Sequence, residues 1–250
     1  MTNNNMYFIA NWKMQGNTKL IDRVKSLKSL LKQKKYKKCK IIYCPPFTLI
    51  KTFNDKIKSS HIKLGAQNCN ASYEYGPITG AINPKLIKSV GAKYVIVGHS
   101  ESREQGDTNY DINQKIKSSL KTKLKVIFCI GEKYNDKKHK NTNKVLKNQI
   151  KKGLNKIKKF KDIIIAYEPV WSIGTGIIPN NFELKKTIVI IKKSLSKFTK
   201  GNKIRIIYGG SVNPKNVKNL AKIKELDGFL VGGASLNAKK FIDIIKKSIN

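Results

Sequence analysis

The feature that most constrains the fold is an eightfold alternation of short apolar runs with longer amphipathic segments. Runs rich in β-branched and aromatic residues recur at residues 6–10, 40–43, 62–66, 94–97, 125–130, 163–167, 204–208 and 228–231. Between them, apolar residues fall at three- and four-residue spacing, as in Leu184, Ile188, Ile191 and Leu195, which is typical of amphipathic helices. Eight repeats over 250 residues give about 31 residues per repeat, and one right-handed βαβ unit uses roughly 30 or more. The pattern predicts an α/β protein: a single (β/α)8 barrel domain over residues 1–250.

Polar and glycine-rich segments directly follow most of these runs. They are Asn11-Trp12-Lys13, Gly98-His99-Ser100, Gly131-Glu132, Glu168-Pro169, Gly209-Gly210-Ser211 and Gly232-Gly233-Ala234. In a barrel the carboxyl ends of all the strands meet at one rim, which is where barrel enzymes keep their active sites. The competing architecture, a doubly wound sheet, would gather fewer of them. We therefore expect a functional site at this rim.

Glu168 is the candidate general base. Pro169 fixes its own φ and disfavours helix at the preceding glutamate, so the carboxylate projects from a restrained strand end. Residues 170–176 then run through Val170 and Trp171 into Gly174-Thr175-Gly176. This segment has the composition of an apolar flap with a flexible far hinge. A lone strand-end glutamate is usually solvated, but a flap over a carboxylate would exclude water.

Two further rim residues suit chemistry on an oxygen beside an acidic C–H bond. His99 can donate a hydrogen bond to a substrate oxygen, although a lone strand-end histidine is usually structural. Lys13 is one of 52 basic residues and stands out only because it lies beside Asn11 at the end of the first run. Donors and cations around a carboxylate favour a reaction in which negative charge develops on oxygen.

The two glycine pairs after the last two runs predict an anion site. In this architecture, phosphate sites are commonly built after strands seven and eight from backbone N–H groups and a short helix N-terminus. Either pair alone is equally compatible with a tight turn. Both together favour a small phosphorylated substrate.

Composition sets the remaining limits. The formal net charge of +37 raises nucleic acid as a partner, but the lysines are spread along the chain without interleaved aromatic residues, which indicates a solvated basic surface. No apolar run approaches the roughly 18 residues of a membrane span, and the first 13 residues lack the order of a signal peptide. Four cysteines form no CxxC pair and only three histidines occur, so we expect reduced thiols, no metal site and no cofactor. These features predict a soluble cytoplasmic protein with no specific nucleic-acid or membrane partner.

The motifs together resemble the triosephosphate isomerase family from about residue 8 to about residue 245. They are Asn11-Trp12-Lys13-Met14, Gly65-Ala66-Gln67-Asn68, Gly98-His99-Ser100-Glu101, Cys129-Ile130-Gly131-Glu132, the run from Ala166 to Trp171, Ile173-Gly174-Thr175-Gly176, Tyr208-Gly209-Gly210-Ser211 and Val231-Gly232-Gly233-Ala234. Eight motifs in the family's order make the resemblance specific. It implies a TIM barrel and an aldose-ketose isomerase of glycolysis and gluconeogenesis, which interconverts dihydroxyacetone phosphate and D-glyceraldehyde 3-phosphate through an enediolate.

The resemblance also implies a role for each site residue. Glu168 would be the base, His99 the neutral electrophile, and Lys13 the cation that stabilises the oxyanion, with Glu101 holding Lys13 and Asn11 completing the polar wall. The substrate phosphate would sit on backbone N–H groups of Gly174, Ser211, Gly232 and Gly233. Closure of the flap would protect the enediolate from losing phosphate.

The family is a homodimer in which the loop after the third strand enters the partner, and the loop from Ala71 to Ala81, with Thr79 at its tip, is similar to that loop. Four departures from the family pattern affect the interface and the flap. Ser102 replaces the usual arginine, Ala81 replaces the usual acid, the segment 104–108 is about one residue short, and Ile177 replaces a commonly longer or basic residue. They bear on dimer strength and flap kinetics rather than on the reaction.

Two alternatives stay open at this stage. A different phosphosugar isomerase or lyase on the same barrel would keep the phosphate glycines but should not combine Glu168-Pro169 and its flap with the Gly98 to Glu101 motif. A nucleic-acid-binding protein would need no catalytic rim. A coupled assay with glyceraldehyde 3-phosphate separates all three.

Overall fold

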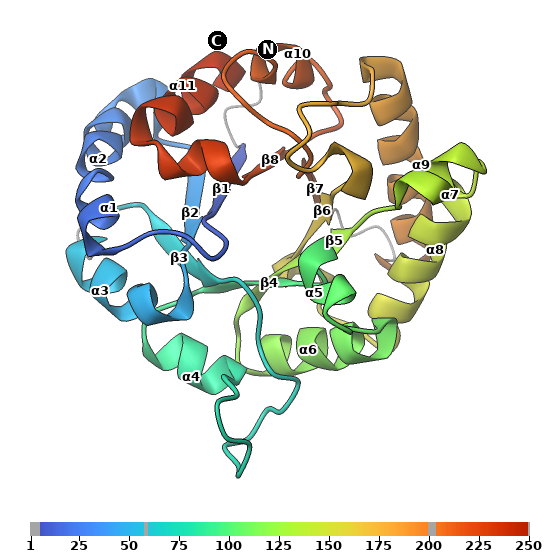
Figure 1. Ribbon diagram of the computed structural model, residues 1–250, viewed down its shortest axis with the longest axis horizontal. Helices are drawn as coiled ribbons and strands as arrows, with labels where there is room; N and C mark the ends of the chain where they lie inside the picture. The colour runs from blue at the N-terminus through green and yellow to red at the C-terminus, as the bar shows by residue number, and fades with distance from the viewer. Residues whose placement is uncertain (1–5, 58–59, 200–203, 250) are drawn as a thin grey trace.

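Eight parallel strands form a closed barrel in the computed structural model, which describes residues 6–57, 60–199 and 204–249 (Figure 1). The other residues of the expected 1–250 domain lie outside the described part. The strands are β1 (Tyr7–Asn11), β2 (Lys40–Cys44), β3 (Lys63–Ala66), β4 (Tyr94–Val97), β5 (Lys125–Ile130), β6 (Ile163–Tyr167), β7 (Arg205–Tyr208) and β8 (Gly228–Val231). Each strand pairs with its neighbours in sequence order, and β1 pairs with β8 from Tyr7↔Gly228 to Ala10↔Val231. The predicted barrel is confirmed, and every predicted run contains its strand to within one residue.

Helices surround the barrel, as Figure 1 shows. They are α1 (Thr18–Asp22), α2 (Lys25–Lys32), α3 (Phe47–Ile57), α4 (Pro84–Ser89), α5 (Ser100–Glu104), α6 (Asn109–Lys121), α7 (Tyr134–Lys138), α8 (Thr142–Gly153), α9 (Asn181–Thr199), α10 (Val217–Leu220) and α11 (Ala238–Ile249). Short 3-10 turns are η1 (Lys34–Tyr36), η2 (Phe160–Asp162), η3 (Val170–Ser172) and η4 (Gly233–Leu236). The helices follow the strands one unit after another, which is the arrangement that the sequence period predicts.

Two apolar layers hold the barrel together. One cluster contains only strand residues, among them Ile9, Ile96 and Ile207, and therefore fills the barrel interior. The other combines the alternate strand residues, such as Phe8, with helix residues such as Phe53. Side chains two residues apart lie on one face of a strand, so each strand contributes to both layers. This explains why the runs are apolar throughout instead of alternating with polar residues.

The loop between β3 and α4 projects away from the barrel (Figure 1). It includes residues 71–81, and two of its large apolar side chains are exposed, Tyr75 by 64% and Ile78 by 52%. Its ends are tied to the body, because Asn70 N–H donates to Ile82 O at 2.8 Å and Asn83 Nδ2 donates to Glu74 O at 2.8 Å. The loop is thus a braced projection with an apolar surface.

Candidate active site

Because side chains alternate between the two faces of a strand, certain residues at the strand ends face the barrel interior. Asn11 is the last residue of β1 and lies two positions after the inward-facing Ile9. Glu168 follows β6 and lies two positions after the inward-facing Ala166. Both side chains therefore lie at the mouth of the barrel, at the carboxyl ends of the strands.

The Glu168 carboxylate is buried in this mouth beside His99. Glu168 is 2% exposed, and its backbone N–H donates to Ile130 O at 2.8 Å, so its backbone is fixed by β5. Its Oε1 lies 3.4 Å from His99 Nε2, whereas Oε2 has no hydrogen-bond partner among the described residues. Burial raises the pKa of Glu168 above its usual range, an effect that His99, Cys129 and Lys13 oppose. An ionised carboxylate with an unpaired, desolvated oxygen is a base.

His99 is held by the helix that follows it. It is the N-cap of α5, and its Nδ1 accepts the backbone N–H of Glu101 at 3.3 Å. The Glu101 carboxylate also lies 3.5 Å from Nδ1, but it is half exposed and bound to Lys13, whereas the helical N–H is fixed. We therefore assign the Nδ1 lone pair to that N–H. The ring proton of the imidazole then lies on Nε2 and faces Glu168.

Lys13 occupies a strained backbone position that several contacts support. Its φ is 53°, a left-handed conformation that costs a non-glycine residue roughly 1–2 kcal/mol. Asn11 Oδ1 accepts its backbone N–H at 3.1 Å, and Gln67 Nε2 donates to its carbonyl at 2.8 Å. Its Nζ lies 2.7 Å from Glu101 Oε1. Lys123, Lys140 and Lys156 have similar φ values, so it is the contacts with Asn11, Gln67 and Glu101 that set Lys13 apart.

Two glycines make room for Glu168. A Cβ on Gly209 would lie 2.7 Å from Glu168 Cγ and 3.1 Å from its Oε1. A Cβ on Gly131 would overlap the Glu168 carbonyl oxygen. The glycines of these two motifs therefore set the position of the carboxylate by close approach.

The flap, residues 170–176, leaves the barrel beside Glu168. It begins with η3, and Trp171 Nε1 donates to Glu132 Oε1 at 2.9 Å. Ser172 Oγ, in η3, donates to the carbonyl of Ile177, just past the far end of the flap, at 2.6 Å and lies 2.9 Å from Tyr208 Oη. Gly174 and Gly176 have φ of 72° and 79°, so the hinge uses the conformational freedom of glycine.

The four residues expected at the phosphate lie in two places. A Cβ on Gly232 would contact Lys13 Cε at 3.7 Å, so Gly232 lies beside the candidate catalytic cation, and the exposed Gly233 follows it. The Ser211 N–H points toward the flap, with Ser172 Oγ at 3.4 Å. Gly174 stands in open space, since an added Cβ would meet no atom within 4 Å. The structure brings Gly232 and Lys13 together, and it places Gly174 on a separate, exposed flap.

The structure places two motif residues, Glu132 and Gln67, in contact with the candidate site, although the sequence predicted no role for either. Glu132 is buried, accepts hydrogen bonds from Tyr167 Oη at 3.2 Å and from Trp171, and has a pKa raised by burial. Gln67 supports Lys13 and also donates to Cys44 O at 2.8 Å. Both follow predicted strands, and that position was the available signal.

Within residues 6–57, 60–199 and 204–249, no cluster of three or more His, Cys, Asp and Glu side chains is arranged to hold a metal ion. All four cysteines are buried and free. No helix in the described part of the chain has the length and apolarity needed to cross a membrane.

Comparisons with known proteins agree with this geometry. A family model described as triosephosphate isomerase matches residues 6–248. The triosephosphate isomerase of Dictyoglomus turgidum is 41% identical over 95% of this chain and 97% of its own length. That of Clostridium botulinum (strain Okra / Type B1) is 40% identical over 94% and 96%. The crystal structure of triosephosphate isomerase from Bartonella henselae superposes with a TM-score of 0.89 at 30% identity, covering 97% of this chain and 98% of that one.

Proposed function

Because the chain belongs to the triosephosphate isomerase family and interconverts dihydroxyacetone phosphate and D-glyceraldehyde 3-phosphate, we propose that Glu168, His99 and Lys13 carry its proton transfers. The family gives the enzyme its place in glycolysis and gluconeogenesis. The observation that supports these residue roles best is the buried Glu168 carboxylate, with Oε1 3.4 Å from His99 Nε2 and Oε2 unpaired.

In the proposed mechanism Glu168 takes a proton from C1 of dihydroxyacetone phosphate. The C1–H electron pair forms the C1–C2 double bond, and the carbonyl pair moves onto the C2 oxygen. The Nε2–H of His99 and the ammonium of Lys13 stabilise that oxygen, because preorganised donors act strongly in a desolvated site. A proton then passes from the C1 oxygen to the C2 oxygen through Nε2, and Glu168 returns its proton to C2. The product is the aldehyde, and the base is regenerated.

Asn11 and Glu101 hold Lys13 for this role. Asn11 stabilises the strained turn, and Glu101 binds the ammonium at 2.7 Å. Glu101 also presents the N–H that fixes the His99 ring. We assign Lys13 and Asn11 to substrate binding as well as to catalysis. Glu101 is a positioning residue.

The substrate phosphate is assigned to the backbone N–H groups of Gly232, Gly233, Ser211 and, after flap closure, Gly174. The position of Gly232 beside Lys13 supports this assignment, because glycine backbones at the ends of strands seven and eight admit an anion closely. The exposed Gly174 would reach the anion only when the flap moves. Closure would exclude water from the enediolate.

The test is a pair of substitutions followed in a coupled assay. Glu168→Asp withdraws the carboxylate by about 1 Å and is expected to lower kcat about 10²-fold. His99→Asn should lose about 10² to 10⁴-fold while still binding a phosphorylated transition-state analogue. Near-normal turnover in Glu168→Asp removes Glu168 from the base role, and loss of analogue binding in His99→Asn makes His99 structural.

We also propose a single-domain, cytoplasmic homodimer that has no specific nucleic-acid partner. Tyr75 and Ile78 are exposed in the projecting loop 71–81. Met14, in the loop between β1 and α1, is 96% exposed. Apolar side chains on a braced projection are typical of an interface. Sedimentation equilibrium should give twice the mass of 28.3 kDa; a monomer at micromolar concentration would refute the dimer.

A further inference from the structure

A groove outside the active site lies between α6 and α8, and we call it the basic groove. Its volume is about 900 Å³, within the range of roughly 300–1,000 Å³ that small-molecule sites occupy. Five of its lining side chains are basic: Arg103, Lys117, Lys151, Lys152 and Lys156. In Figure 1, α6 and α8 lie on the outer ring of helices, away from the barrel mouth.

The floor of the groove is fixed. Asn113, on α6, is buried, and its Nδ2 donates to Gly153 O at 2.8 Å and to Asn155 O at 3.0 Å. These bonds tie α6 to the end of α8, so the two helix backbones that carry Lys117, Lys151 and Lys152 keep their separation.

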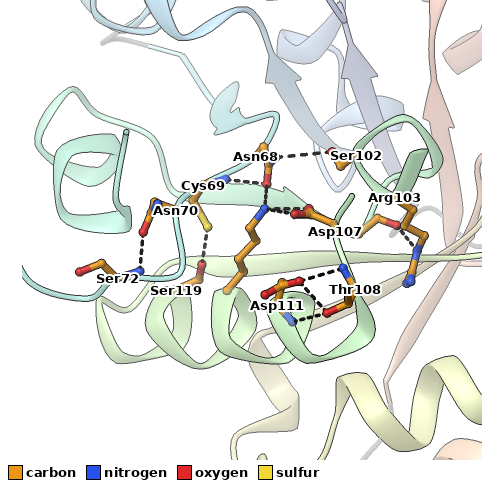
Figure 2. Close-up of polar contacts among 12 residues, drawn as sticks. Asn68, Cys69, Asn70, Ser72, Ser102, Arg103, Asp107, Thr108, Asp111 and Ser119 are labelled. Carbon is orange, nitrogen blue, oxygen red and sulfur yellow. Dashed lines mark hydrogen bonds and ion pairs between the residues drawn. The ribbon is translucent and has the colours of Figure 1, made fainter. Parts of the chain in front are cut away.

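None of the five cations of the groove forms an ion pair with a carboxylate in the described part of the chain, although Asp111 lies beside the lining residue Thr108. Asp107 is the acidic residue in its lining, and both of its oxygens already bind Lys115 Nζ, at 2.6 and 2.7 Å (Figure 2). Among residues 6–57, 60–199 and 204–249, the oxygens that accept from Arg103 are neutral, those of Gly98 at 2.8 Å, Cys129 at 3.2 Å and the Asn109 side chain at 2.9 Å.

The four groove lysines form no ion pair with a described carboxylate. On other faces, lysines such as Lys51 and Lys56 pair with aspartates at 2.7 Å. Several cations converging on one groove repel one another, and a multivalent anion relieves that repulsion. The groove therefore favours a ligand that carries several negative charges.

One aromatic ring and several amides complete the lining. Tyr110 lies in the first turn of α6 and is 71% exposed. Gln114 and Asn155 also line the groove and carry amide groups, which are both donors and acceptors. Exposed tyrosine rings stack on nucleobases, and amides bind base edges. This combination suits a base attached to a polyphosphate.

We propose that the basic groove binds a nucleoside triphosphate. The phosphates contact Lys117, Lys151, Lys152 and Lys156, and the base stacks on Tyr110. The site is separate from the triose phosphate site, since none of its lining residues is a proposed catalytic or phosphate-binding residue.

The test is calorimetric titration of ATP into the enzyme saturated with dihydroxyacetone phosphate, which blocks the active site. We expect one ATP bound per chain. The variant Lys117→Gln/Lys151→Gln/Lys152→Gln should weaken binding at least tenfold. The matched control is Lys144→Gln/Lys218→Gln/Lys239→Gln, which removes the same charge from exposed helical positions outside the groove. It should change the Kd less than twofold, and both variants should keep isomerase activity, which checks their fold.

A second arm tests the base. Tyr110→Ala should weaken ATP binding severalfold and leave the binding of inorganic tripolyphosphate unchanged. Three results would overturn the proposal: competition of dihydroxyacetone phosphate with ATP, equal losses in the two triple variants, or tripolyphosphate binding as tightly as ATP. Equal losses would assign ATP binding to the diffuse basic surface.

Discussion

Gly209→Ala should displace Glu168, the proposed base, without replacing that residue. The added Cβ would stand 2.7 Å from Glu168 Cγ, whereas carbon atoms in contact prefer about 3.5–4.0 Å. The φ of Gly209 is not in the left-handed region, so alanine can adopt the backbone, and Glu168 must move by about 1 Å. A displacement of that size costs about 10²-fold in rate, or about 2.7 kcal/mol of activation free energy.

The assay is kcat and KM by coupled spectrophotometry, with thermal unfolding as a fold check. We expect kcat to fall about 10²-fold with little change in KM, because the proposed phosphate-binding residues stay in place. The free energy of unfolding should fall by about 1–3 kcal/mol, because the added methyl group overpacks the site. Gly233→Ala is the comparison variant. Its Cβ would meet no atom within 4 Å, so any loss that it causes comes from the proposed phosphate contact and not from displacement of Glu168. A folded Gly209→Ala enzyme with kcat within twofold of the parent would refute the idea that this glycine sets the position of Glu168.

Three further predictions follow from the electrostatics. Glu168→Gln should raise the free energy of unfolding at pH 7.5, because burial raises the pKa of Glu168 in the folded state and its ionisation then opposes folding. The gain should shrink as the pH falls toward the ordinary glutamate pKa of about 4.3, and denaturant titrations that show a pH-independent gain would contradict the argument. Since the net charge is +37, kcat/KM should fall as potassium acetate is raised; a flat profile, with tight and salt-sensitive binding to duplex DNA, would instead support a nucleic-acid role. Ala81→Glu and Ser102→Arg should each weaken the proposed dimer, and the double variant should recover most of the loss, with a coupling of about 1 kcal/mol or more in dissociation measurements. Strict additivity would show that the two sites do not meet.

The barrel could be predicted because its signal is local and repeated. Each strand is an apolar run that ends in a polar or glycine-rich segment, so its bounds can be found within one residue. The helix after β1 shows the limit of this approach. Leu20, Val24, Leu27 and Leu31 recur at spacings of three and four residues, which is typical of an amphipathic helix, and the structure forms two helices here, α1 and α2. Periodicity records which face is buried and does not record a break between turns.

Site residues could be predicted only where they directly follow a predicted strand. Glu168 and His99 follow strands, so the topology alone placed them at the rim. The role of Glu132 depends on Tyr167 and Trp171, which lie 35 and 39 residues further along the chain. The pairing of Lys115 with Asp107 was equally hidden, because a lysine in a chain with 52 basic residues has no distinguishing sequence signal. Contacts between side chains of distant segments need the three-dimensional register.

The pairing of β1 with β8 has a consequence for biosynthesis. The first strand to leave the ribosome finds its second partner only when residues 228–231 have been made. Any sheet formed before then is open, with β1 at one unpaired edge, and such edges are templates for pairing with other chains. The lysines that cover the finished surface are already present on those partial sheets. Like charge opposes association, so this composition disfavours edge-to-edge pairing between incomplete chains.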